Sequence, residues 1–288
     1  MIRISTFNAY FNQVFGEKEG LKKIKDCGYD FVEFNFNDCF SFENGLFFKD
    51  ERTFTEYFKD LKNFLDSIKL TVIATRAPAL PCEKSLSQKI KKIINKSVSA
   101  TEILGAEYIT VEPLISADSE NFQEQDYETT CKLLEEYVSA ADTMHVQVLL
   151  VNAVSYNEIK RAGAPNAFSS ANKLLRLINR FKGKVYACLD TGKAYYAGQN
   201  PATTAELLGK NLKVIRLNDN LGINDVKAVL YGGHIVWDKV LESLKKIDFD
   251  GIFTIDVDYL RSTKTAMLPL AELMRIVATD FSLRIKDK

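Results

Sequence analysis

The sequence predicts an α/β fold, a closed (β/α)8 TIM barrel that forms a single domain over residues 1–288. Eight short β-rich runs alternate with eight helical segments along 288 residues, which gives 36 residues per unit. Such alternation implies parallel strands joined by helical crossovers. The first strand is not followed by GxGxxG, and no proline- or glycine-rich linker divides the chain. Both absences favour a closed barrel over an open dinucleotide-binding sheet or two domains.

The predicted strands are apolar or alternating runs rich in β-branched and aromatic residues. In chain order they are residues 2–7, 31–34, 70–75, 108–111, 146–152, 185–190, 214–218 and 252–257.

The predicted helices carry apolar residues at helical spacing. In the segment 51–67, for example, Phe54, Phe58 and Leu61 recur at i, i+4 and i+7, and Gly105 is a typical stop after 86–104. The helical segments are residues 17–27, 51–67, 86–104, 124–144, 167–181, 201–208, 237–247 and 263–278.

The composition excludes several classes of function. Thirty-eight basic and 38 acidic residues cancel, so no nucleic-acid or membrane partner is expected. The only histidines, His145 and His234, are too few for a multinuclear zinc site. Without a GKS or GKT phosphate loop we expect no nucleotide cofactor. Five scattered cysteines and the absence of a signal peptide predict a cytoplasmic protein, and the sequence leaves homo-oligomerisation open.

Polar and charged residues gather at the predicted strand ends, where barrels place their functional groups. These residues are Glu33, Arg76, Glu112, Asn152, Asp190, Lys193, Arg216, Asn218 and Asp256. Uncompensated charges near a barrel interior are costly, so these groups should pair with one another or with a ligand. A site for a polar ligand is the favoured interpretation.

Five motifs in order resemble the xylose isomerase-like TIM barrels, the family of sugar phosphate isomerases and epimerases. Residues 27–34 read CGYDFVEF, 104–109 LGAEYI, 189–194 LDTGKA, 233–237 GHIVW and 249–256 FDGIFTID. The similarity runs through nearly the whole chain.

The resemblance implies a divalent ion that stabilises an enediolate and is held by two glutamates, an aspartate and a histidine. Asp190 matches the aspartate, and Asp256 replaces one glutamate by a shorter carboxylate. Other functional positions of the family hold residues that are neither acids nor imidazoles: Val151, Lys193, Arg216 and Asn218. Asp190 and Asp256 are therefore the predicted ligands of an Mg²⁺ or Mn²⁺ ion that is weakly bound or absent.

The leading hypothesis is a sugar or sugar-phosphate isomerase or epimerase with an altered metal site. Its substrate is a small sugar or sugar phosphate, and proton transfer runs through an enediolate at the barrel mouth. Asp256 is the predicted base and Glu112 the opposite proton acceptor, while Lys193 or Arg216 stabilises the enediolate. The predicted substrate-binding residues are Arg76, Asn152, Arg216, Asn218 and His234.

Two alternatives stay open. The first is a catalytically inactive or regulatory barrel that binds a sugar or an anionic metabolite, because Val151 removes a ligand and a base in one change. The second is a metal-independent enzyme in which Lys193 and Arg216 bind a phosphorylated or carboxylated substrate.

Overall fold

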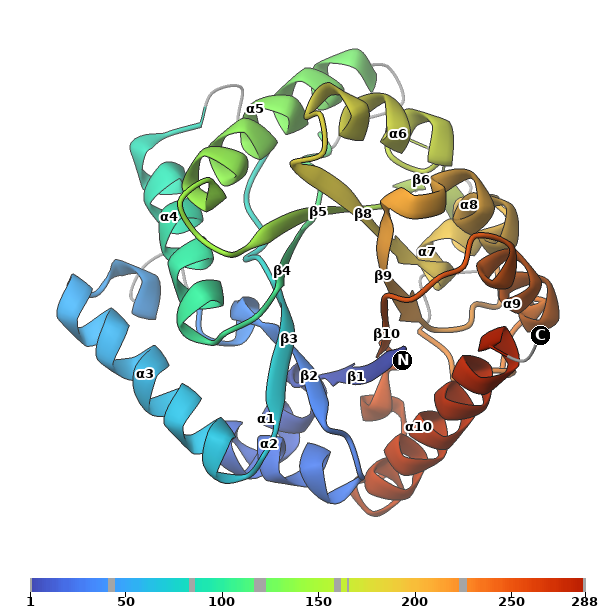
Figure 1. Cartoon of the computed structure of the whole chain (residues 1–288), viewed down its shortest axis with the longest axis horizontal. Helices are drawn as coiled ribbons and strands as arrows, with labels where there is room; N and C mark the ends of the chain where they lie inside the picture. The colour runs from blue at the N-terminus through green and yellow to red at the C-terminus, as the bar shows by residue number, and fades with distance from the viewer. Residues whose placement is uncertain are drawn as a thin grey trace.

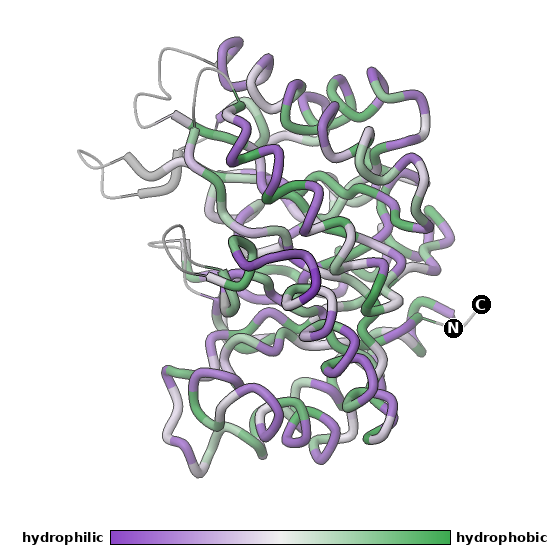
Figure 2. Tube along the Cα trace, turned by 90° about the vertical axis from the view of Figure 1, so that its left-hand side faces the viewer, coloured by the Kyte–Doolittle hydropathy of each residue, from purple (hydrophilic) through white to green (hydrophobic). Residues whose placement is uncertain are grey.

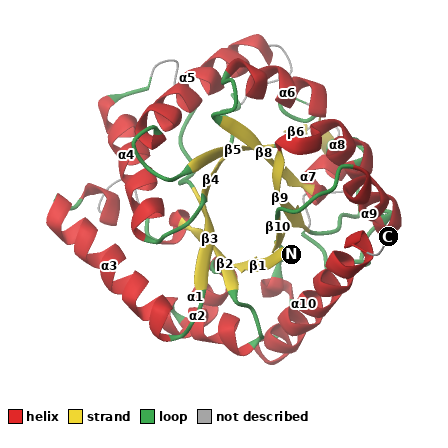
Figure 3. Cartoon of the chain, in the orientation of Figure 1, coloured by secondary structure: helices red, strands yellow, loops and turns green. Residues whose placement is uncertain are grey.

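In a computed structural model of the chain, eight parallel strands close into a barrel surrounded by helices (Figures 1 and 3). The strand order is β1-β10-β9-β8-β5-β4-β3-β2, and β1 pairs with β10 to close the sheet. The prediction of a (β/α)8 barrel is confirmed. The residues that the structure describes are 2–40, 45–82, 86–116, 123–157, 162–164, 166–222 and 227–286.

The barrel strands follow the predicted runs closely. They are β1 (Arg3–Phe7), β2 (Phe31–Asn35), β3 (Thr71–Arg76), β4 (Tyr108–Val111), β5 (Gln147–Val151), β8 (Val185–Asp190), β9 (Leu212–Leu217) and β10 (Ile252–Ile255). A short antiparallel hairpin, β6 (Ser155–Asn157) with β7 (Ala162–Ala164), follows β5 outside the barrel. The sequence did not predict it, because three-residue strands are too short to show an alternating pattern.

Besides four 3-10 turns of three residues each, ten α-helices are found in the described part of the chain. They are α1 (Ala9–Phe15), α2 (Glu17–Asp26), α3 (Glu51–Ser67), α4 (Gln88–Ile103), α5 (Gln123–Ala141), α6 (Ala171–Arg180), α7 (Thr191–Tyr196), α8 (Pro201–Leu208), α9 (Trp237–Lys246) and α10 (Lys264–Lys286). The short α1 and α7 were not predicted, since neither spans enough turns to show a helical period. Among the described residues, no helix combines the length and the apolar character needed to cross a membrane.

Local chemistry sets the ends of several helices. The side chains of Asp50, Ser87 and Ser170 accept hydrogen bonds from main-chain N–H groups three residues later, which starts α3, α4 and α6. Gly105, at a φ of 74°, follows the end of α4 as predicted. These caps fix where each helix begins and therefore how the loops at the strand ends are placed.

The core has two layers, one between the sheet and the helices and one inside the barrel. Along the outer helices hydrophilic and hydrophobic residues alternate, because one face of each helix packs on the sheet (Figure 2). The inner layer includes Val214, Cys188 and Ile252. Since side chains alternate along a strand, residues two positions further on, at 216, 190 and 254, also point into the barrel. An apolar floor thus lies beneath the polar mouth.

Candidate functional site

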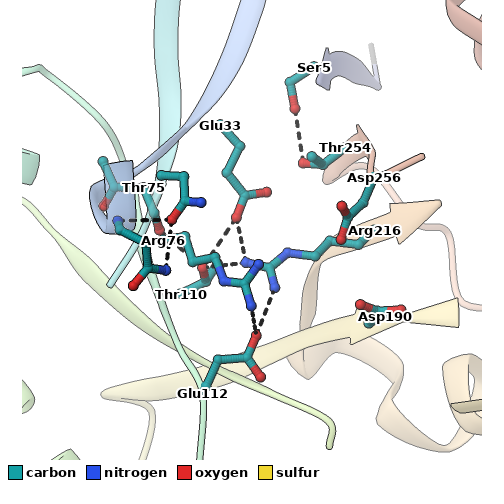
Figure 4. A network of polar contacts seen from close by, with 12 residues as sticks. Ser5, Glu33, Thr75, Arg76, Thr110, Glu112, Asp190, Arg216, Thr254 and Asp256 are labelled. Atoms are coloured by element: carbon teal, nitrogen blue, oxygen red, sulfur yellow. Dashed lines mark hydrogen bonds and ion pairs between the residues drawn. The ribbon is translucent and has the colours of Figure 1, made fainter. Parts of the chain in front are cut away.

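Arg216 lies at the centre of the barrel mouth with its side chain fully buried (Figure 4). One guanidinium nitrogen donates to Glu33 Oε1 and to Thr110 Oγ1, both at 2.6 Å. The other donates to Glu112 Oε1 at 3.2 Å. Burial opposes the charge, but Glu33 and the other acids nearby hold the pKa of Arg216 above its ordinary value. A buried guanidinium is tolerated because carboxylates surround it.

Three cationic side chains contact Glu112. Lys193 Nζ lies 2.8 Å from Glu112 Oε2, and Arg76 donates to Oε1 at 3.0 Å, beside Arg216. Burial would raise the pKa of Glu112, but these three charges outweigh it and hold the pKa well below its usual range. We call Glu33, Arg76, Thr110, Glu112, Lys193 and Arg216 the arginine cluster.

A second ion pair lies at the end of β10. Lys227 Nζ contacts both oxygens of Asp256, at 2.7 and 2.6 Å, and the aspartate is almost completely buried. Burial would raise the pKa of Asp256, but Lys227, Arg216 and Arg76 lower it. Asp256 therefore stays ionised against its lysine partner.

The fold fixes Lys227 through its main chain. The carbonyl of Lys227 accepts a hydrogen bond from the N–H of Asp258 at 2.9 Å, and Ala228 pairs with Asp219 through two main-chain bonds of 3.0 Å. The side chain then reaches over the Phe7 ring, whose centroid lies 5.8 Å from Nζ. No sequence pattern points to Lys227, because it stands in the long connection between β9 and α9.

Asp190 is held by neighbours that leave one of its oxygens without a donor. Its Oδ1 accepts from the N–H of Lys193 and from Asn218 Nδ2, both at 3.0 Å. Its Oδ2 and the Oδ1 of Asn218 are buried and have no hydrogen-bond partner. We call Asp190, Asn218, Lys227 and Asp256 the aspartate cluster.

Two residues shape the surroundings of Asp190. Both polar atoms of the Asn152 amide are bonded to the main chain of Asp190, at 2.6 and 3.1 Å. A Cβ on Gly192 would lie 1.8 Å from Asn218 Oδ1, so only glycine lets that amide approach. The structure thus uses Asn152 as a brace for β8, and its predicted contact with substrate stays a prediction.

The strand-end pattern thus predicted most of the mouth, and the structure brings its charged residues into two adjoining clusters. Among the predicted charged residues, Glu112 forms ion pairs with Arg76, Lys193 and Arg216. Arg216 also forms an ion pair with Glu33. Their assignment to a ligand stays a prediction. Besides Lys227, Phe7 was not predicted to lie at the site. The centroid of its ring lies 5.9 Å from the guanidinium of Arg76 and 4.9 Å from that of Arg216. Its place at the end of β1 was the available signal.

His234 is placed elsewhere. It lines a pocket of about 630 Å³ with Tyr195 and Lys239, and no other predicted site residue lines that pocket. The surrounding GHIVW motif has structural contacts, because Asp219 accepts hydrogen bonds from the Ile235 N–H and the Trp237 indole. The predicted role of His234 in substrate binding stays a prediction.

Comparison with known proteins assigns the family. Residues 21–276 match the family described as xylose isomerase-like TIM barrel. The chain belongs to this family. The resemblance read from the five motifs is therefore confirmed.

Individual relatives are distant. An uncharacterised protein of Methanocaldococcus jannaschii, MJ1311, is 24% identical over 202 residues, which cover 67% of this chain and 66% of that protein, just under two thirds of its length. The crystal structure of a D-tagatose 3-epimerase-like protein is similar with a TM-score of 0.74 and 17% identity, covering 99% of this chain and 98% of the other. The IOLI protein with a bound zinc atom has a TM-score of 0.70 and 16% identity, with coverage of 99% and 98%. At these identities the structural likeness establishes the fold alone.

The described residues do not fit the divalent ion that the resemblance implies. They contain no group of three or more histidine, cysteine, aspartate or glutamate residues able to hold a metal. Lys227 occupies both oxygens of Asp256, so a divalent ion about 4 Å from that ammonium would meet a repulsion of about 8 kcal/mol at an effective dielectric of 20. Of the two predicted metal ligands, Asp256 is therefore already held by the ammonium of a lysine side chain.

Proposed function

We propose that this protein is a sugar isomerase or epimerase whose reaction takes place at the mouth of the barrel. The family supports this class of chemistry, and so do structural neighbours that are named as epimerases of sugars. The observation that carries the proposal is the buried Asp256 carboxylate in contact with the Lys227 ammonium. A carboxylate base beside a cation is what proton removal next to a carbonyl requires.

The proposed reaction moves one carbon-bound proton and one hydroxyl proton. Asp256 takes the proton from the carbon beside the sugar carbonyl, and the electron pair of that C–H bond forms an enediolate whose oxygen is stabilised by a lysine ammonium. Lys227, beside Asp256, and Lys193, at the edge of the arginine cluster, are the candidates for this role. Asp256 then returns the proton to the former carbonyl carbon, and the proton of the neighbouring hydroxyl moves to the former carbonyl oxygen, which gives the isomeric sugar. Asp190 Oδ2, which has no donor, is available to accept a hydrogen bond from a sugar hydroxyl.

The contacts of Glu112 bear on the type of reaction. Three cations contact Glu112 directly, whereas Lys227 is the one cation that contacts Asp256 among the described residues, so Glu112 is the weaker proton acceptor of the two. Return of the proton on the face from which it left needs one base, as in aldose–ketose isomerisation, whereas inversion at a single carbon needs a second group on the opposite face. We therefore favour isomerisation with Asp256 as the base, and assign Glu112 to hold the cations in place.

The test is exchange of the substrate proton with solvent. Aldoses and ketoses, free and phosphorylated, are incubated with the protein in D₂O, and loss of the proton next to the carbonyl is followed by NMR. Asp256→Asn should slow exchange by at least about 100-fold. Asp258→Asn is the matched control, because that carboxylate contacts Arg261 at 3.0 Å. Exchange that is equally fast in Asp256→Asn would remove Asp256 from the mechanism, and no exchange with any sugar would remove the activity.

A second function, sugar binding without catalysis, is favoured by one observation. Glu112 and Asp256 are both ion-paired to cations in this structure, so neither is a free base. Under this alternative, calorimetry detects sugar binding that Asp190→Ala weakens, while the exchange experiment detects no reaction.

A further inference from the structure

We infer that the Lys227 ammonium takes the place of the divalent ion implied by the family, so that the mouth works with a cation built into the chain and without a metal. The inference rests on the proposed function only in assigning the cation a role in catalysis. Its structural part concerns which cation Asp256 holds, and this can be measured without any substrate.

The charges of the mouth balance without a metal ion. The aspartate cluster contains two carboxylates, Asp190 and Asp256, and one cation, Lys227, so it carries one excess negative charge. The arginine cluster contains three cations and two carboxylates, so it carries one excess positive charge. The eight charges balance as they stand, and a bound divalent ion would add two positive charges to a neutral mouth.

Lys227 engages both oxygens of Asp256. Its ammonium has three N–H donors, and the two oxygens of Asp256 lie 2.7 and 2.6 Å from Nζ. Both oxygens of one of the two predicted metal ligands are thereby engaged. Among the described residues no other acid lies within ion-pair distance of Lys227, so the remaining donor is available for a substrate oxygen.

The fold holds Lys227 in place through its main chain and through an aromatic ring. The main-chain bonds of Lys227 and Ala228 tie the segment to Asp258 and Asp219. Lys227 also faces the Phe7 ring, which stabilises an ammonium through its π-electrons. A lysine that lay beside Asp256 by chance would not need these main-chain hydrogen bonds or the contact with the Phe7 ring.

Metal binding tests the inference directly. Wild-type protein, dialysed against EDTA and then metal-free buffer, is titrated with Mn²⁺ and followed by electron paramagnetic resonance and calorimetry. We expect less than about one tenth of an equivalent bound at millimolar Mn²⁺. Stoichiometric binding that Asp256→Asn abolishes would overturn the inference, and this arm decides even if a Lys227 variant fails to fold.

The variant arm asks whether Lys227 excludes the ion. In Lys227→Gln the aspartate cluster gains a second excess negative charge, so Mn²⁺ binding should tighten at least about tenfold relative to wild type. Lys227→Arg keeps the charge and should bind as little as wild type. Lys246→Gln, an exposed lysine paired with Glu206 at 3.3 Å, is the matched control and should not change binding. Equal binding by Lys227→Gln and wild type would overturn the assignment.

The exchange assay separates this inference from the proposed function. Proton exchange that persists in EDTA supports both. Exchange that stops in EDTA and returns with Mn²⁺ keeps the isomerase and overturns the built-in cation. Absence of exchange with any sugar, together with absence of metal binding, removes the isomerase and leaves the structural role of Lys227 standing.

Discussion

The two halves of the barrel mouth use the same kinds of residues to different ends. In the arginine cluster every charged side chain has an opposite charge within 3.2 Å, and Arg216 is sealed from solvent. In the aspartate cluster Asp190 has no ion-pair partner among the described residues, and its Oδ2 accepts no hydrogen bond. The first half therefore neutralises its own charges around Arg216, and the second half leaves a carboxylate oxygen available to a ligand.

The largest effect on stability is expected from a substitution that breaks the arginine cluster. Arg216→Met leaves Glu33 buried without its cation, which should lower the free energy of unfolding by about 3–5 kcal/mol. Urea denaturation measures the change. Asp256→Asn, which removes a charge from the other half while keeping its shape, should cost less. If Asp256→Asn lowers the free energy of unfolding more than Arg216→Met does, the proposed difference between the two clusters is wrong.

A smaller effect is expected where the aspartate cluster packs against α7. Gly192→Ala puts a Cβ 1.8 Å from Asn218 Oδ1, and relief of that clash should cost about 1–3 kcal/mol of unfolding free energy. In the double variant Gly192→Ala/Asn218→Ala the clash is gone, so the two losses should not add. Additive losses in the cycle would show that the close approach of Asn218 is not what requires glycine.

The pH dependence of stability should carry the signature of Glu112. Its pKa is lowered in the folded chain, so below the ordinary value of about 4.3 the unfolded state binds a proton that the folded state does not. Stability is therefore fully present above that pH and is lost on acidification, by up to about 1.4 kcal/mol per pH unit for one such group.

Glu112→Gln should flatten that acid slope in urea unfolding curves recorded from neutral pH downward. Glu124→Gln is the matched control, because Glu124 forms an exposed pair with Arg176 at 3.1 Å. An unchanged acid slope in Glu112→Gln would mean that its cations do not stabilise the charged form.

The smallest effect is expected for an ion pair outside both clusters. Arg176 is 62% exposed beside Glu124, so solvent and salt screen the attraction. Arg176→Met should leave the urea midpoint unchanged within error, while the same substitution at Arg216 shifts it strongly. A large shift at Arg176 would contradict the view that the ion pairs of the mouth stabilise the fold because they are buried.

How much of this was predictable follows from where each residue stands. The alternation of runs predicted the barrel, and the strand-end rule found Arg76, Glu112, Asp190, Arg216 and Asp256, because parallel strands bring their carboxyl ends together. The sequence did not show which of these charged side chains form ion pairs, since this depends on how far each side chain reaches across the barrel.

Lys227 could not be found in this way. Its contact with Asp256 depends on main-chain pairing between Ala228 and Asp219, which leaves no trace in residue type or spacing. Asn152 shows the reverse case, because its position at a strand end suggested substrate while both amide atoms bond to the backbone of Asp190.

The closure of β1 on β10 has a consequence for how the chain folds as it is synthesised. The Phe7 ring is made early, but two of the cations that face it, Arg216 and Lys227, and the strand that seals the sheet are made late. Until β10 is in place, β1 and β9 are open edges that invite pairing with other chains. The sheet can close only after β10 has been made, so the chain with these two edges open is the form most exposed to aggregation.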